Sequence, residues 1–344
     1  MKTFYILLIL TASVFSLSGQ QTFSGPASGY VFDNVQQSIR PLLGLPGASW
    51  LGARSGVEQQ WDSVSVAPNG KWGLGLSGLS INLIPDLSQP DTSTSVGEAS
   101  GPISRIVWSA DSTTAVTWSP TTGQLQRITA LDSTPIVHTP LDLTVLSGVL
   151  SGWNLSHDGR YVALSGPALG RASVFLSDHD GAPAPIGYLT DPGAVAFSAD
   201  STSLFVVNGA RHQIAILDLS SGSIEGAIDT SPFAAGASVP DTGSRNPRMP
   251  RPASTAIQDL AVSADGFTLY AIGGETLCGY DLSVGNMPSC SNLEVAPRSF
   301  QSMPGGILLL NYSRTGSMPL WLLDGKTGQT WFVPAGNTAA DASF

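Results

Sequence analysis

The sequence predicts an all-β fold, a β-propeller built of four-stranded blades, and three observations support this prediction. A pattern of apolar strand, tight turn and second apolar strand returns six times along the chain, and no stretch shows a helical period. The repeat length is about forty residues, which is the length of one propeller blade. Gly and Pro are abundant, as the turns between many short strands require.

The turn of each unit defines the register of the repeat. The turn residues are Asn69, Asp111, Asp158, Asp200, Asp265 and Gly305, at separations of 42, 47, 42, 65 and 40 residues. Asp or Asn followed by Gly or Ser suits a tight hairpin, because the short polar side chain caps the turn and Gly tolerates positive φ. The flanking runs are rich in Val, Leu and aromatic residues, as buried strands require. The separation of 65 indicates one insertion.

A third and a fourth strand follow the hairpin in most units. We expect third strands at 80–84, 172–176, 214–217, 277–280 and 319–323, and fourth strands such as 223–228 and 330–333. Several third strands end in an acidic turn that begins at Asp218, Asp281 or Asp324. Four strands in each unit are typical of a blade, whereas a β-sandwich would show turn signals without the long period.

The number of blades depends on the N-terminal segment. Six units are complete, and residues 30–33 and 38–43 read as the third and fourth strands of another unit. These strands would either complete a seventh blade or pair with the C-terminal blade, because a propeller must hide its last edge strand. We predict seven blades, with six as the close alternative.

The unit around Ser198 resembles the YVTN/WD40-like propeller repeats of secreted bacterial proteins. Residues 198–200 stand where that repeat places its turn, 204–208 match its second strand, and 216–218 with Gly222 match its third strand and second turn. The resemblance covers nearly all of the mature chain at the level of strand and turn pattern, and it implies the propeller architecture. The Gly-His and Trp-Asp marks of eukaryotic WD40 blades are missing, which disfavours that branch.

The N-terminus has the pattern of a cleaved signal peptide. Lys2 precedes a short apolar run at 4–10, and small residues at 16–18 suit a signal peptidase. The run is too short to span a bilayer. We therefore expect a signal peptide at 1–18, a short linker at 19–28, one propeller domain at 29–335 with an insertion at 229–256, and a tail at 336–344. The mature chain is predicted to be secreted or periplasmic, with no membrane span.

Composition and cysteine usage agree with that location. Charged residues make up only 12% of the chain and the formal net charge is −10, which argues against a nucleic-acid partner. The chain has two cysteines, Cys278 and Cys290, and they lack the CxxC spacing of a redox or metal site. In an oxidising compartment this pair predicts a disulfide, which would contribute about 3 kcal/mol in the chain-entropy model.

The blade geometry sorts the charged residues onto two faces. First-to-second and third-to-fourth turns lie on one face, where turn chemistry accounts for the aspartates. The second-to-third loops and the connections between blades lie on the other. That second face collects Arg171, Arg211, His212 and Arg314 from loops, and Arg54, Arg105 and Arg298 from connections, with acidic neighbours such as Glu98, Asp191 and Glu275. Arg171, Arg211, His212 and Arg314 are our candidate ligand-binding residues, since binding residues concentrate on loops.

The insertion adds three further candidates. Arg245, Arg248 and Arg251 are three residues apart between prolines, and polyproline geometry with three residues per turn would align them. The segment is either a basic arm over the central channel or a tolerated flexible insertion, and its Pro, Gly and Ser content favours the second interpretation.

The sequence contains no recognisable catalytic set. A GxSxG elbow, an HExxH helix, a P-loop and a dinucleotide fingerprint are all missing, so we predict no metal site and no cofactor, and the sequence assigns no catalytic residues. The leading hypothesis is a monomeric, non-enzymatic propeller that binds or scaffolds a protein, a glycan or a small anionic ligand. The alternatives are a lactonase-like propeller hydrolase, whose catalytic residues map onto no positions here, and a cell-envelope structural protein.

Overall fold

The computed structural model of the chain describes twelve stretches of sequence. They are residues 27–45, 47–55, 60–141, 143, 146, 150–168, 171–179, 181–235, 257–285, 288–294, 296–311 and 319–334. The predicted signal peptide, the predicted tail and most of the predicted insertion lie outside these residues.

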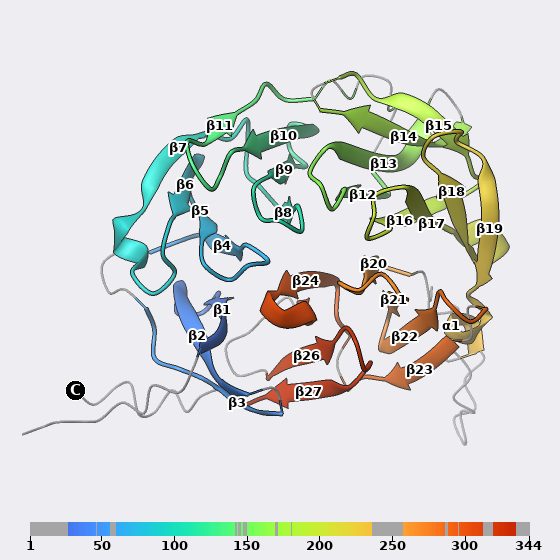
Figure 1. The fold of residues 1–344 in the computed structure, drawn as a ribbon. Helices are drawn as coiled ribbons and strands as arrows, with labels where there is room; N and C mark the ends of the chain where they lie inside the picture. The colour runs from blue at the N-terminus through green and yellow to red at the C-terminus, as the bar shows by residue number, and fades with distance from the viewer. Residues whose placement is uncertain are drawn as a thin grey trace, which may run out of the picture.

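Seven antiparallel sheets follow one another around a ring, as Figure 1 shows. Blade 1 has three described strands, β1 (Ala27–Asp33), β2 (Ser38–Leu45) and β3 (Ala48–Leu51). Blade 2 has β4 (Ser63–Val66), β5 (Gly73–Ser77), β6 (Ser80–Ile84) and β7 (Thr94–Glu98). Blade 3 has β8 (Arg105–Trp108), β9 (Ala115–Ser119), β10 (Gln124–Thr129) and β11 (Ile136–Val137). Blade 4 has β12 (Gly152–Leu155), β13 (Tyr161–Ala168), β14 (Arg171–Asp178) and β15 (Ala184–Tyr188).

The remaining three blades repeat the four-stranded plan. Blade 5 has β16 (Pro192–Phe197), β17 (Ser203–Asn208), β18 (Gln213–Asp218) and β19 (Ile224–Asp229), and the short helix α1 (Ser231–Ala235) follows it. Blade 6 has β20 (Asp259–Val262), β21 (Thr268–Gly273), β22 (Thr276–Asp281) and β23 (Pro288–Asn292). Blade 7 has β24 (Ser299–Met303), β25 (Ile307–Asn311), β26 (Leu320–Asp324) and β27 (Thr330–Val333). The predicted propeller of seven blades is confirmed.

The hydrophobic core is divided among the interfaces between blades. Seven clusters of buried side chains each combine residues of two neighbouring blades, and together they cover all seven interfaces. Val31 and Leu42 of blade 1 pack on Leu309 of blade 7, so packing joins the two ends of the ring. No strand of blade 7 is hydrogen-bonded to blade 1 in the described part of the chain. Of the two predicted roles for the N-terminal strands, forming a seventh blade is confirmed.

Hydrogen bonds between loops define the two faces of the ring. In blade 5 the third-to-fourth turn meets the first-to-second turn, because Leu219 N donates to Thr202 O at 2.9 Å. The second-to-third loop meets the incoming connection, because Gly209 N donates to Asp191 O at 2.8 Å. We call the first side the hairpin face and the second side the connection face. The predicted sorting of loops onto two faces is confirmed.

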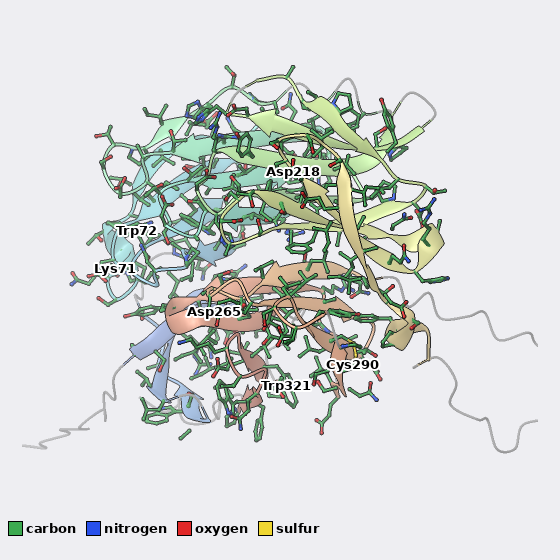
Figure 2. All side chains as sticks on the ribbon, turned by 45° about the vertical axis from the view of Figure 1, so that its right-hand side comes forward. Lys71, Trp72, Asp218, Asp265, Cys290 and Trp321 are labelled. Carbon is green, nitrogen blue, oxygen red and sulfur yellow. A yellow bond between two sulfur atoms is a disulfide. The ribbon has the colours of Figure 1, made fainter. Side chains whose placement is uncertain are left out.

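A serine and an aspartate build the turn that marks the repeat. Ser198 Oγ donates to Asp200 Oδ1 at 2.6 Å and accepts a hydrogen bond from Ser203 N at 2.9 Å. Ser109–Asp111, Ser156–Asp158 and Ser263–Asp265 make the same bond, and Figure 2 labels Asp265. The residue after each aspartate has positive φ, at Ser112, Gly159, Ser201 and Gly266. This left-handed position explains why Gly or Ser follows the aspartate.

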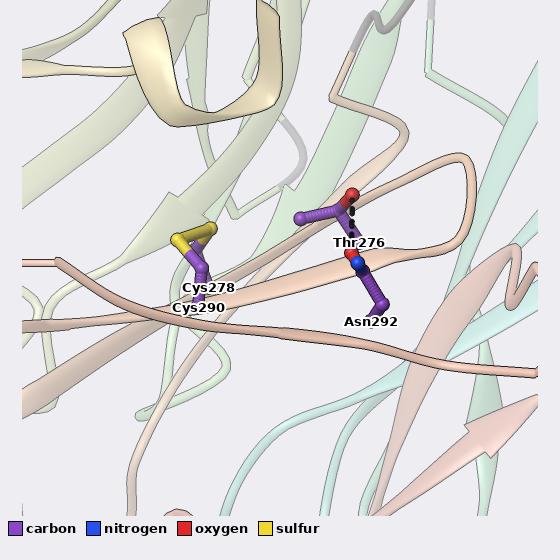
Figure 3. The surroundings of a disulfide bond; sticks show 4 residues. All are labelled: Thr276, Cys278, Cys290 and Asn292. Atoms are coloured by element: carbon purple, nitrogen blue, oxygen red, sulfur yellow. Dashed lines mark hydrogen bonds between the residues drawn. A yellow bond between two sulfur atoms is a disulfide. The ribbon is translucent and has the colours of Figure 1, made fainter. Parts of the chain in front are cut away.

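The predicted disulfide is confirmed in blade 6. Cys278 of β22 and Cys290 of β23 are direct cross-strand partners, and they are joined by a disulfide (Figure 3). Thr276 and Asn292 face each other two residues away on the same pair of strands, with a hydrogen bond of 3.5 Å between their side chains. Because β23 is the exposed outer strand, the bridge holds it to the blade at a buried position.

Candidate functional site

The first strands of the blades surround a central channel. Its cavity of about 750 Å³ is lined by residues of β4, β8, β12, β16, β20 and β24, together with β1 of blade 1. Among the described lining residues, the ionisable groups are Arg105, His157, Asp259 and Arg298. Three of these four stand at or just before the start of a first strand, which places them at the mouth of the channel on the connection face.

An ion pair crosses this mouth. Arg105 begins β8 of blade 3 and Asp259 begins β20 of blade 6, so two blades lie between them on one side of the ring and three on the other. Arg105 Nη2 donates to both carboxylate oxygens of Asp259, at 3.3 and 3.4 Å. Phe300 N of blade 7 also donates to Asp259 Oδ2, at 2.8 Å. The buried carboxylate therefore ties blades 3, 6 and 7 together and holds the guanidinium in place.

The guanidinium of Arg105 keeps donors free for a ligand. Its Cζ atom lies over the ring of Trp153, 5.4 Å from the ring centre. This is a cation–π distance, so the indole ring stabilises the guanidinium group in this position. The Arg105 side chain retains 32% exposure, while that of Asp259 retains 4%. The two bonds to Asp259 come from Nη2 alone, and Nε and Nη1 make no hydrogen bond with the described residues. Each of these two groups can donate a charge-assisted hydrogen bond to a carboxylate or phosphate oxygen.

Arg298 adds a second cation to the same cavity. It lies just before β24, it is exposed, and it has no ion-pair partner among the described residues. His157 lies toward the other end of the channel, in the first-to-second turn of blade 4, where its Nδ1 is 3.1 Å from Ala199 O of blade 5. The histidine therefore joins two neighbouring turns, and the cations that a ligand meets on the connection face are the two arginines.

The sequence-predicted ligand residues fall in three groups. Arg211 and His212 are exposed in the second-to-third loop of blade 5, on the connection face as predicted. Arg171 begins β14 after the equivalent loop of blade 4, and its side chain is outside the described part. Arg314, Arg245, Arg248 and Arg251 lie outside the described residues. None of these residues lines the channel cavity as described.

Sequence reasoning missed the partners of Arg105. It placed Arg105 and Arg298 on the connection face, but it did not single out Asp259 or Trp153. The available signal was the position of Asp259 directly before the apolar run of a first strand, where a lone carboxylate needs a partner once it is buried. The described residues contain no group of three His, Cys, Asp or Glu side chains that could hold a metal ion.

Comparison with known proteins supports the propeller fold and gives no information on function. No protein-family model matches the chain, and no curated protein matches it. A crystal structure of a functionally unknown protein from Desulfotomaculum acetoxidans DSM 771 is similar, with a TM-score of 0.57 over 89% of this chain and 95% of that chain. The two sequences are 14% identical. The likeness shows the propeller fold alone.

Proposed function

We propose that this protein is an extracytoplasmic, non-enzymatic binding module that holds a small anionic ligand at the connection-face mouth of its channel. The observation that carries the proposal is the cross-channel pair, in which Asp259 fixes Arg105 while leaving Nε and Nη1 for a ligand. A guanidinium that is already positioned loses little side-chain freedom on binding, which favours affinity.

The surroundings strengthen the attraction for an anion. The site combines Arg105 and Arg298 against one carboxylate, so its local charge is opposite to the net charge of −10 on the whole chain. A partly enclosed cavity screens charges less than open solvent does, because fewer water molecules reach them. The exposed Arg211 and His212 lie on the same face and extend the surface available to a larger ligand.

The extracytoplasmic location is part of the proposal. It is supported by the signal-peptide pattern at 1–18, by the resemblance to YVTN/WD40-like repeats of secreted bacterial proteins, and by the disulfide in blade 6. Among the described residues no helix has the length and apolar character needed to cross a membrane.

Calorimetric titration of the full chain tests the binding site. Citrate and inorganic phosphate serve as probes, since they present a carboxylate and a phosphate to the two arginines. We expect Arg105→Ala to weaken binding by at least about tenfold, corresponding to about 1.4 kcal/mol. Arg105→Lys should recover only part of the affinity, because a single ammonium cannot bond Asp259 and present the two remaining guanidinium donors in fixed directions. Raising the salt concentration should weaken binding further.

Arg160→Ala is the matched control. Arg160 is an arginine on the hairpin face, half exposed and paired with Asp178 at 2.7 Å. Its removal should leave the affinity for both probes unchanged. Wild-type protein that binds neither probe, or an Arg105→Ala variant with unaltered affinity, contradicts the proposed site.

A further inference from the structure

Strand β1 runs in the opposite direction to the other strands that line the channel. It begins near the hairpin face, where Gly29 packs against Met303 at the end of β24. It ends near the connection face, where the turn after it meets the start of blade 2 through a hydrogen bond from Trp61 N to Gln37 O at 3.5 Å. The first strands of blades 2–7 all run from the connection face to the hairpin face.

The three strands of blade 1 therefore correspond to the second, third and fourth strands of a regular blade. The sequence pattern predicted that residues 30–33 and 38–43 form the third and fourth strands of a blade. This assignment was one strand too far from the channel, because the short strand β3 that follows gives little sequence signal. β1 pairs only with β2, so its inner edge has no partner strand among the described residues. No described strand occupies the position of a first strand in blade 1.

The channel cavity extends sideways into this position. In blades 3 to 6, the cavity is lined only by first strands and the residues beside them. Next to blade 1 it also reaches Leu309 of β25 and Leu320 of β26 on one side, and Leu76 of β5 on the other. Both walls of this cleft are apolar, with Val64 and Val66 beside Leu76. Its floor is the unpaired edge of β1, lined by Val31 and Phe32.

The cavity reaches the connection face at Asn34 and Arg298, and the cleft is closed at the hairpin face. There the turn of blade 2 touches the turn of blade 7, because Gly70 packs on the ring of Pro304 with no room for a Cβ atom. A strand in the cleft has to enter from the connection face and stop below this contact. A strand that directly preceded β1 would have to turn at the hairpin face, where Gly70 and Pro304 occupy the space.

We infer that the residues following β27 enter this cleft and form the first strand of blade 1. Each blade passes its chain to the next from a fourth strand to a first strand on the connection face, and β27 is the fourth strand of blade 7. Between three and six residues separate these strands at 99–104, 189–191 and 293–298. The same spacing after Val333 starts a strand between residues 337 and 340.

The chemistry of this segment fits the cleft. Ala340, Ala342 and Phe344 alternate along it, so all three would face the same wall in an extended strand. A strand antiparallel to β1 would also pair with the N–H and C=O groups on its inner edge, which have no partner strand among the described residues. Main-chain hydrogen bonds to β1 would provide the affinity of the added strand. Its apolar side chains would fix the register of the pairing, as in other cases of strand addition.

Hydrogen exchange of the full chain, read by mass spectrometry on β1 peptides, tests the inference. We expect the β1 amides that point away from β2 to exchange at least about 100-fold more slowly in the full chain than in a variant lacking 335–344. Ala342→Asp should lose the same protection, because it places a charge against an apolar wall. Ala335→Asp, which carries the same change in the connecting residues, should keep it. The substitutions keep the inference testable if the shortened chain does not fold.

Three results would overturn it. Equal exchange in the full and shortened chains shows that the edge of β1 stays open. Protection lost only on removing 19–26 assigns the position to the N-terminal segment. Protection that depends on protein concentration assigns it to a second copy of the chain. The inference concerns the completion of blade 1 and does not depend on the anion site, so titration and exchange can fail separately.

Discussion

The two buried tyrosines of blade 6 differ in the hydrogen bonding of their hydroxyl groups. Tyr270 Oη donates to Gly325 O of blade 7 at 3.2 Å and so links two blades. The hydroxyl of Tyr280 is buried between blades 5 and 6 and has no partner among the described residues. Burial raises the pKa of Tyr280 to about 12. An unpartnered buried hydroxyl costs free energy, whereas a paired one contributes.

Replacing each tyrosine by phenylalanine should therefore give opposite results. Tyr270→Phe should lower the free energy of unfolding by about 1 kcal/mol, since Gly325 O loses its donor. Tyr280→Phe should leave that free energy unchanged or raise it by up to about 1 kcal/mol. Urea unfolding followed by tryptophan fluorescence measures both, and equal losses in the two variants would show that Tyr280 has a partner.

Most of the first-to-second turns could be predicted from the sequence, because their hydrogen bonds join residues that are close together in the chain. The serine, the aspartate and the left-handed residue after it lie within a few positions of one another, so a sequence pattern captures the whole turn. The pattern fails only where the residues differ. Blade 7 uses Pro304 and two glycines of positive φ in place of the serine and aspartate.

At the scale of elements, the disulfide is the clearest case of sequence predicting structure. The two cysteines are twelve residues apart, and this spacing brings them opposite each other on β22 and β23. All five residues of β23 are exposed, so the strand buries little apolar surface of its own. The bridge at Cys278 therefore supplies an attachment that packing does not.

Removing the disulfide should destabilise β23 more than it destabilises the rest of the propeller. The double variant Cys278→Ala, Cys290→Ala should lose about 2–3 kcal/mol of unfolding free energy. Exchange of the β23 amides should accelerate while that of β17, in the core of blade 5, stays slow. Reduction of the wild-type protein serves as the comparison, and thiol labelling of the denatured, unreduced chain would contradict the bridge.

At the scale of the whole molecule, the turn aspartates act together. Hydrogen bonds from Ser198 and Thr202 lower the pKa of Asp200, and the bond from Ser263 lowers that of Asp265. The pKa values of Asp218 and Asp281 are lowered in the same way by neighbouring serines. A carboxyl group with a lower pKa in the folded chain stabilises the fold above its unfolded pKa and loses this contribution as pH falls.

Stability should accordingly be nearly constant from about pH 5 to about pH 9 and fall on both sides. The acid limb should begin below about pH 4, as the turn aspartates take up protons. The alkaline limb should begin above about pH 10, because the raised pKa values of Tyr270 and Tyr280 favour their neutral forms in the fold. Thermal unfolding across this range measures both limbs. Asp200→Asn with Asp265→Asn should make the acid limb shallower, and an unchanged limb would exclude these turns as its cause.

The sequence by itself determined the repeat, the turn chemistry, the disulfide and the division of the loops between two faces. All of these follow from residues close together in the chain or from a regular period. Only the tertiary structure decided the pairing of Arg105 with Asp259, its contacts with Trp153 and Phe300, and the direction of β1 in blade 1. Arg105 and Asp259 are 154 residues apart, and they meet because the closed ring brings blades 3 and 6 across one narrow channel.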